Sequence, residues 1–391
     1  MYDKNKGSVS DYLYQRLLDG SFSFYNEVGW LSLQSVDGRD YAIKPIDFTL
    51  YNGNSGIVLA ILYYSINKKN IERELIDKVL NYSFSYIEEF ENNGISLPLG
   101  AFDGLYGLIY TLTNMAKSNM FLDINFKNII QEMMRKSEPL LSEFEELDII
   151  RGASGILGVL VTVYEVFEND VEIRTKAKQL CQKMIFKLLK ARKQNNGLWI
   201  KDDIGYAHGN YGVAVQLIRY SKILSGFEKS SLVNEVKKGI KEVESQFENG
   251  QKYITRKNSK YYSWCNGVSG VLLAKHFILE NSLVYDSYST VINTQINKLI
   301  IDLTKHLGDD LSICHGLIGN LAIIDKTNIN LSKVINLEKE IGLKIFTLKR
   351  EQFDIDDWGL MTGESGMLLA SLPDGLRLVS DILLLNSIKE K

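Results

Sequence analysis

The sequence predicts an all-α fold, an α/α toroid in which seven helical hairpins close into a ring. The pattern Gly-x-x-Gly, followed by an apolar stretch, occurs seven times along the 391 residues. Successive first glycines are 51, 48, 57, 58, 49 and 47 residues apart, and an even period of this length is typical of repeat architectures. The first glycines of the seven motifs are Gly53, Gly104, Gly152, Gly209, Gly267, Gly316 and Gly363.

Each motif opens a segment that is apolar on nearly every side, as in a helix surrounded by protein. Between the motifs lie amphipathic stretches, such as residues 71–84 and 180–188, with apolar side chains at helical spacing. We therefore expect one inner and one outer helix in each repeat. Closing the ring removes the need for terminal capping repeats. Glycine at the motif should allow a sharp turn and a close approach to neighbouring backbone.

The first fifty residues follow a different pattern. The stretch GWLSLQSVDGRDYAIKP, residues 29–45, combines residues that favour β-strands with turn signals. We expect residues 1–50 to form a short extended lead-in packed on the toroid, and residues 51–391 to form the seven-repeat domain.

The composition excludes several classes of partner. Lys and Arg total 45 against 48 Asp and Glu, so the net charge of −3 provides no basic surface for nucleic acid or anionic membrane. The amino-terminal residues lack the apolar core of a signal peptide, and no apolar run reaches the roughly 18 residues of a membrane helix. We expect a cytoplasmic protein. Its three cysteines are too few for a disulfide framework, so each is a buried residue, a reactive thiol or a metal ligand.

If all motifs lie at one end of the ring, the residues just before them should face the central opening. His208 lies one residue before the fourth motif, and Cys265 lies two residues before the fifth. Cys314 and His315 lie two residues and one residue before the sixth motif. Two cysteines and a histidine from neighbouring repeats predict a zinc site with an open fourth position, as in catalytic zinc sites. For Cys265 alone, a small side chain packed at a helix start is the alternative.

The other candidates have structural interpretations. Cys181 falls in the apolar stripe of an outer helix and is expected to be an inert buried thiol. His306 is expected at a helix end, where it complements the helix dipole, and His276 is expected in a core or inter-helix position. Asp103 and Asp148 precede the second and third motifs, where Asp commonly caps a helix. Capping is the favoured interpretation for Asp103, whereas for Asp148 capping and a functional role are both open.

Three segments carry a resemblance to a known family. SWCNG at Cys265, ICHG at Cys314 and AHG at His208 resemble the signature segments of the lanthionine synthetase C-like cyclases, in the same order. GWLSLQSV, GAFDGLYGLIYTL and WGLMTGESG are most similar to the carboxyl-terminal cyclase half of class II lanthipeptide synthetases. Those enzymes also carry a dehydratase domain, for which this chain has no room. We expect a free-standing cyclase or an excised domain.

The resemblance implies a toroid with one zinc ion per chain, held by Cys265, Cys314 and His315. It implies that His208 is the catalytic acid/base residue and that Asp148 matches the family's aspartate near the site. The implied substrate is a dehydrated ribosomal precursor peptide, whose cysteine thiols add to dehydroalanine or dehydrobutyrine to form lanthionine or methyllanthionine. A separate dehydratase, or a dehydratase domain, is the implied partner. Asn266 departs from the histidine that many class II cyclases have after the first ligand cysteine.

Two other functions remain open from the sequence. One is a non-catalytic family member that contains zinc and binds thiol-bearing peptides or a partner protein. The other is a glycosidase on a helical toroid, which would need Asp103 and Asp148 to face each other across the opening. The glycosidase leaves the cysteines and His315 unexplained.

Overall fold

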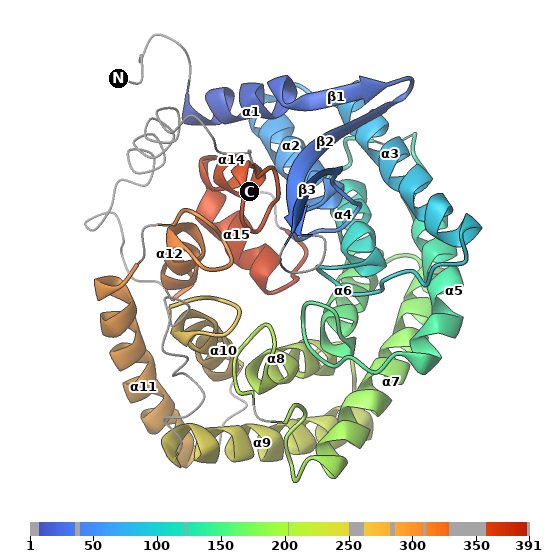
Figure 1. Cartoon of the computed structure of the whole chain (residues 1–391). Helices are drawn as coiled ribbons and strands as arrows, with labels where there is room; N and C mark the ends of the chain where they lie inside the picture. The colour runs from blue at the N-terminus through green and yellow to red at the C-terminus, as the bar shows by residue number, and fades with distance from the viewer. Residues whose placement is uncertain are drawn as a thin grey trace.

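The predicted inner helices are all present, and each begins directly after the first glycine of a motif. The computed structural model describes residues 8–35, 40–121, 123–201, 203–249, 262–281, 286–307, 310–327 and 357–388. Figure 1 shows the inner helices arranged around a common centre. Within the described residues they are α2 (Asn54–Lys68), α4 (Leu105–Lys117), α6 (Ala153–Val166), α8 (Asn210–Ser221), α10 (Val268–Glu280), α12 (Leu317–Lys326) and α14 (Glu364–Ala370).

A second layer of longer helices surrounds the inner ones (Figure 1). The described outer helices are α3 (Arg73–Asn92), α5 (Phe126–Glu143), α7 (Val171–Gln194), α9 (Gly226–Asn249) and α11 (Asp286–Lys305). In α7, Leu180, Met184 and Leu188 are fully buried, whereas Phe186 is 70% exposed, so one face packs inward as the sequence predicts.

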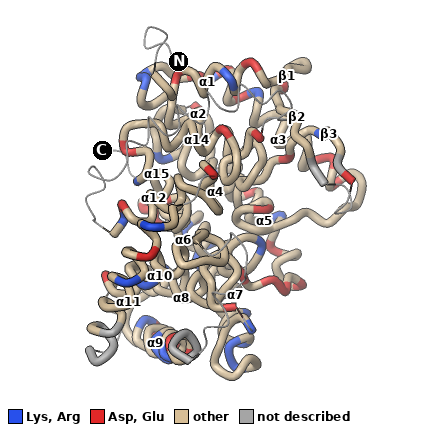
Figure 2. Tube along the Cα trace, turned by 60° about the vertical axis from the view of Figure 1, so that its left-hand side comes forward, with Lys and Arg blue, Asp and Glu red and all other residues tan. Residues whose placement is uncertain are grey.

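Charged residues of both signs are scattered over the outer helices (Figure 2). This distribution agrees with the small net charge and shows no single strongly charged face among the residues drawn. Within the described part of the chain, no helix combines the length and the apolar composition that crossing a membrane requires.

The ring is closed by a belt of backbone hydrogen bonds between the loops that precede the motifs. In each link, a backbone N–H of one loop donates to a backbone carbonyl of the next loop, over 2.8 to 3.0 Å. The last link returns to the first loop, which confirms the predicted α/α toroid. The donors and acceptors are Tyr51 to Phe102, Phe102 to Ile150, Ile149 to Ala207, Ala207 to Cys265, Trp264 to Cys314, Ile313 to Met361, and Met361 to Tyr51.

The motif glycines are required for space. A Cβ atom on Gly319 would lie 1.8 Å from the carbonyl oxygen of Ile313, and one on Gly152 would lie 2.1 Å from the backbone nitrogen of Asp148. The φ angle of Gly152 is −101°, which any residue can adopt. The close approach expected from the sequence is therefore confirmed, and at Gly152 the glycine is not needed for an unusual turn.

The amino-terminal residues contain the predicted strands. They form an antiparallel sheet in the order β1 (Ser21–Phe24), β2 (Glu27–Ser35) and β3 (Tyr41–Pro45), with Leu33 opposite Ile43. The boundary between lead-in and toroid at residue 50 stays a prediction.

A helix that the sequence analysis did not anticipate precedes this sheet. Helix α1 (Val9–Asp19) packs against α14 and α2, where the last repeat meets the first. Arg16 of α1 forms an ion pair with Glu364 of α14. The amino terminus thus supplies the outer helix at the seam of the ring (Figure 1).

The far end of the ring is closed by the carboxyl terminus. Helix α15 (Gly375–Leu383) packs on α12 and α14, and residues 384–388 follow it. The hydroxyl of Tyr110 donates to the carbonyl of Asn386 over 2.7 Å, and Arg219 donates to the carbonyl of Leu384 over 3.1 Å. Because Tyr110 and Arg219 lie downstream of the starts of α4 and α8, this closed end is away from the motif loops.

Candidate metal centre and pocket

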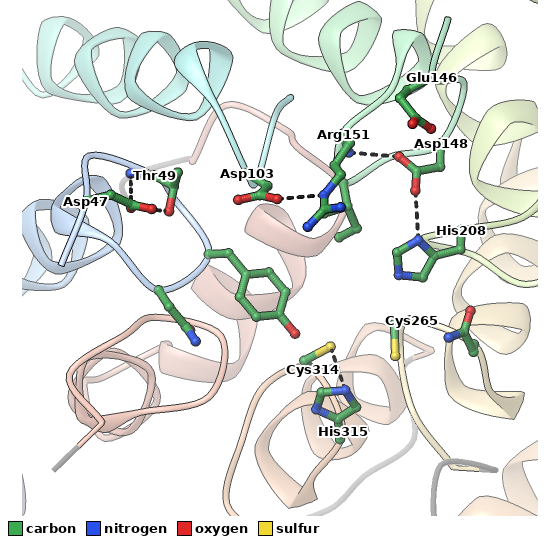
Figure 3. Close-up of a pocket in the computed structure, with 14 residues that line it drawn as sticks. Asp47, Thr49, Asp103, Glu146, Asp148, Arg151, His208, Cys265, Cys314 and His315 are labelled. Carbon is green, nitrogen blue, oxygen red and sulfur yellow. Dashed lines mark hydrogen bonds and ion pairs between the residues drawn. The ribbon is translucent and has the colours of Figure 1, made fainter. Parts of the chain in front are cut away.

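The motif loops surround a cavity of about 590 Å³ at the open end of the ring, which we call the mouth pocket (Figure 3). Side chains in equivalent positions of successive repeats line it, as the sequence predicts. Those one residue before the first glycine of a motif are Asn52, Asp103, Arg151, His208, Asn266 and His315.

Cys265, Cys314 and His315 form a compact cluster in this pocket. Their candidate ligand atoms all lie within 4.8 Å of one another, and the Sγ atom of Cys314 is 3.5 Å from Nε2 of His315. Both cysteines are buried, whereas His315 is partly exposed. The belt link between Trp264 and the carbonyl of Cys314 holds the two cysteine loops together. The cluster is close enough to hold a metal ion.

The two thiols influence each other's ionisation. A hydrogen bond from the Cys314 thiol, with a further contribution from His315, lowers the pKa of Cys265 to about 4. The same interaction with Cys265 raises the pKa of Cys314 well above its usual value. The pair therefore favours a state with one thiolate and one thiol, and a bound cation would favour a second thiolate.

His208 and Asp148 form a hydrogen-bonded pair on the wall of the pocket. Nδ1 of His208 lies 2.7 Å from Oδ2 of Asp148, and this contact raises the pKa of His208. Because Nδ1 faces Asp148, Nε2 is the ring nitrogen that can contact a ligand in the pocket (Figure 3). The other oxygen, Oδ1, accepts the backbone N–H groups of Arg151 and Gly152 over 2.8 and 3.0 Å. Helix α6 begins after Gly152 without a side-chain cap, so Asp148 holds the loop before the helix rather than capping it. Its functional role beside His208 stays a prediction.

The favoured interpretation of Asp103 is wrong. Helix α4 begins after Gly104 without a side-chain cap. Instead, Oδ2 of Asp103 accepts a hydrogen bond from Nε of Arg151 over 2.6 Å. The carboxylate is therefore paired with the guanidinium group of the neighbouring loop and not with the start of α4. Sequence reasoning did not single out Arg151, although its position one residue before a motif was a usable signal.

The other cysteine and histidines lie outside the lining of the mouth pocket. Cys181 is fully buried in α7, and burial raises the pKa of its thiol. His306 directly follows α11, and its Nδ1 lies 3.0 Å from the carbonyl oxygen of Asp302, as suits a residue at a helix end. His276 lies on α10, and its Nδ1 is 3.5 Å from Glu280. Burial lowers the pKa of His276.

The fold and the cluster define a class of protein: a helical toroid with two thiols and an imidazole at its mouth. A sequence model described as "Lanthionine synthetase C-like protein" matches residues 44–373. Because the match covers most of the 391 residues, the chain belongs to the lanthionine synthetase C-like family.

Two known proteins are similar to this chain. The chain is 26% identical over 401 residues to the lacticin 481/lactococcin biosynthesis protein LcnDR2 of Lactococcus lactis subsp. lactis. The match covers 94% of this chain and 41% of that protein, so the chain spans less than half of the relative's length. The solved structure of nisin cyclase is similar with a TM-score of 0.61 and 19% identity, covering 87% of this chain and 92% of that chain. This likeness shows a shared fold.

Proposed function

We propose that the protein is a zinc-dependent peptide cyclase. Its substrate would be a ribosomal precursor peptide that a dehydratase, in another chain or domain, has already dehydrated. The reaction would join cysteine thiols to dehydroalanine or dehydrobutyrine, forming lanthionine and methyllanthionine rings. The observation that carries this proposal is the juxtaposition of Cys265, Cys314 and His315 with His208 in one pocket. Membership of the family, and the similarity to nisin cyclase and to the lacticin 481/lactococcin biosynthesis protein, support it.

The cluster fits one zinc ion per chain. Thiolates and a neutral imidazole are the ligands zinc prefers, and a tetrahedral ion keeps its ligand atoms about 3.5 Å apart. The three candidate atoms already lie within 4.8 Å of one another, so modest side-chain adjustment suffices. A fourth position would be left for the substrate. Bound zinc would keep the substrate cysteine as a thiolate at neutral pH, although a free thiol has a pKa of about 8.5.

The chain's own residues would handle the proton. The addition forms a bond between sulfur and the β-carbon, moves the alkene electrons towards the α-carbon and carbonyl group, and places a proton on the α-carbon. One proton leaves the thiol and one is added, so a single group that accepts and returns a proton is sufficient. We assign this role to Nε2 of His208. Asp148 would position the ring through Nδ1 and favour the protonated form.

The glycosidase alternative lacks support. Asp103 is paired with Arg151, and Asp148 is paired with His208. A pair of carboxylates free for acid and base roles is therefore not present at these two positions. The non-catalytic binding alternative is separated from the cyclase by the experiment below.

The test combines the protein with a dehydrated precursor and counts alkylatable thiols by mass spectrometry. We expect the wild type to consume thiols. His208→Ala should retain one zinc ion per chain but lose cyclisation, whereas His276→Ala, a histidine outside the pocket, should behave as the wild type. Undiminished thiol counts with several authentic precursors would contradict the cyclase, and loss of zinc from His208→Ala would make His208 a ligand.

A further inference from the structure

The mouth pocket has an uneven distribution of charge. Among the described residues that line it, Arg151 is the only lysine or arginine. The acidic residues of the same lining are Asp47, Asp103, Glu146 and Asp148. A single fixed cation in such a pocket is well placed to act on whichever reacting atom becomes negative.

Arg151 is anchored at both its backbone and its side chain. Its backbone N–H donates to Asp148 over 2.8 Å, and its Nε donates to Asp103 over 2.6 Å. Among the residues that the structure describes, its two terminal nitrogens have no protein partner. The side chain is 68% exposed. Figure 3 shows the guanidinium group between Asp103 and His208, in the wall of the mouth pocket.

The proposed addition produces a negative charge at a defined place. When the thiolate attacks the β-carbon, electron density moves through the α-carbon onto the carbonyl oxygen of the dehydrated residue. Fixed donors directed at such an oxygen stabilise the transition state. A guanidinium group offers a planar pair of N–H donors and stays protonated throughout. The carbonyl carbon is bonded to the α-carbon that His208 would protonate, so in a bound substrate its oxygen would lie close to His208, on the side of the pocket where Figure 3 shows Arg151.

We propose that Arg151 is a catalytic residue that binds the enolate oxygen, and that Asp103 is a positioning residue that holds Arg151. This inference rests on the proposed cyclase function. In the step concerned, the carbon–sulfur bond forms and the alkene electrons move onto the carbonyl oxygen. Arg151 donates hydrogen bonds and keeps its protons, and His208 supplies the proton to the α-carbon as the carbonyl group re-forms.

Stability does not account for the contact between Arg151 and Asp103. Exposed ion pairs contribute little to folding, because water screens both charges. Arg135 provides a matched control, since its side chain is also 68% exposed and it pairs with Glu132 on α5. Arg135 and Arg151 thus differ in location rather than in exposure.

The first experiment measures steady-state cyclisation of a dehydrated precursor. Relative to the wild type, Arg151→Gln should lower kcat about 100-fold, as expected for loss of an oxyanion donor, with KM, zinc content and melting temperature unchanged. Arg151→Lys keeps a positive charge and should recover part of the rate. Arg135→Gln should match the wild type. An Arg151→Gln enzyme with normal kcat, or with a raised KM and normal kcat, would overturn the inference.

The second experiment tests the role of Asp103. Asp103→Asn should lower kcat by less than Arg151→Gln does, and adding it to Arg151→Gln should have no further effect, because both changes act on one interaction. Additive effects would overturn the positioning role. If the wild type itself consumes no thiols, the cyclase proposal fails and this inference fails with it. A wild-type rate in Arg151→Gln, beside an active wild type, rejects the inference alone.

Discussion

Arg151 and Arg219 lie at opposite ends of the ring and differ in their surroundings. Arg219 is 3% exposed and donates to the carbonyl of Leu384, the amide oxygen of Gln216 and the hydroxyl of Thr162. Arg151 is 68% exposed and has one side-chain partner among the described residues, Asp103. At the closed end, the hydrogen-bonding capacity of the arginine is used to hold the carboxyl terminus. At the mouth, part of that capacity remains for a ligand.

This difference separates stability from function. A buried polar group that loses its partner destabilises the fold, whereas an exposed group can be changed with little effect on folding. Substitutions at the mouth should therefore alter metal binding and chemistry, and substitutions at the closed end should alter stability. Variants of both kinds, taken from the largest expected effect to the smallest, test this separation.

The largest effect is expected for Cys314→Ala at the mouth. Removing a ligand should release the metal and lower cyclisation by more than about 100-fold, because several kcal/mol of transition-state stabilisation are lost. Metal analysis and thiol counting measure the two effects. Cys181→Ala, at a buried thiol of α7, should keep the metal and lose about 1 kcal/mol of stability. Equal metal content in both variants would contradict the predicted site.

Arg219→Leu should have the largest effect at the closed end. It leaves the carbonyl of Leu384 and the hydroxyl of Thr162 without this donor, and we expect a loss of about 3 kcal/mol in the free energy of unfolding. Chemical denaturation measures it. The folded fraction should still bind one zinc ion per chain. Loss of zinc without loss of stability would contradict the idea that the closed end determines stability and the mouth determines metal binding.

A change in pH dependence is expected for Asp148→Asn. Asp148 raises the pKa of His208 in the folded protein. The contact between the two residues therefore contributes its full stabilisation below the unfolded histidine pKa of about 6.5, and this stabilisation disappears as pH rises through the folded pKa. Once the substrate cysteine has passed its proton to His208, addition to the alkene needs that proton for the α-carbon, so the rate of cyclisation should fall over the same range. Asp148→Asn should move this alkaline limb to lower pH, measured as a pH–rate profile.

The control for that profile is another carboxylate of the mouth pocket. Glu146 also lines the pocket, whereas the largest cause of the raised pKa of His208 is the hydrogen bond to Asp148. Glu146→Gln should therefore leave the alkaline limb in place. If Asp148→Asn left the alkaline limb unchanged, the ionisation of His208 would not be what controls the pH dependence of the rate.

The smallest effect is expected for Tyr110→Phe. This change removes one hydrogen bond to the carbonyl of Asn386 and keeps the aromatic packing, so it should reduce stability by about 1 kcal/mol. Thermal unfolding measures the change, with cyclisation as the control. A reduced rate at full zinc content would show that the closed end influences the mouth.

The inner ring and its mouth could be predicted because their signals are local. The first glycine of each motif marks the start of a described inner helix, and residues in equivalent positions line one pocket. The clustering of Cys265, Cys314 and His315 follows from the same register. Their roles as zinc ligands, and those of His208 and Asp148 in catalysis, stay predictions.

The features that the sequence did not predict depend mostly on contacts between segments that are distant along the chain. Arg16 pairs with a residue 348 positions away, and the contact of Arg219 with Leu384 spans 165 positions. No local pattern specifies such partners. Helix α1 did have a local signal, since Ser8 and Asp11 form a capping box at its start. The pairing of Asp103 with Arg151 required knowing how adjacent loops meet.

The belt around the mouth uses only main-chain atoms, which has a consequence for engineering. Phenylalanine, isoleucine, alanine, cysteine and methionine occupy the same belt position in different repeats and make the same kind of link. Because these side chains are buried, exchanging one would change the packing around it but not the hydrogen-bonding groups of the belt. A ligand set of different composition could therefore be grafted onto the same cavity, repeat by repeat, on an unchanged main-chain belt.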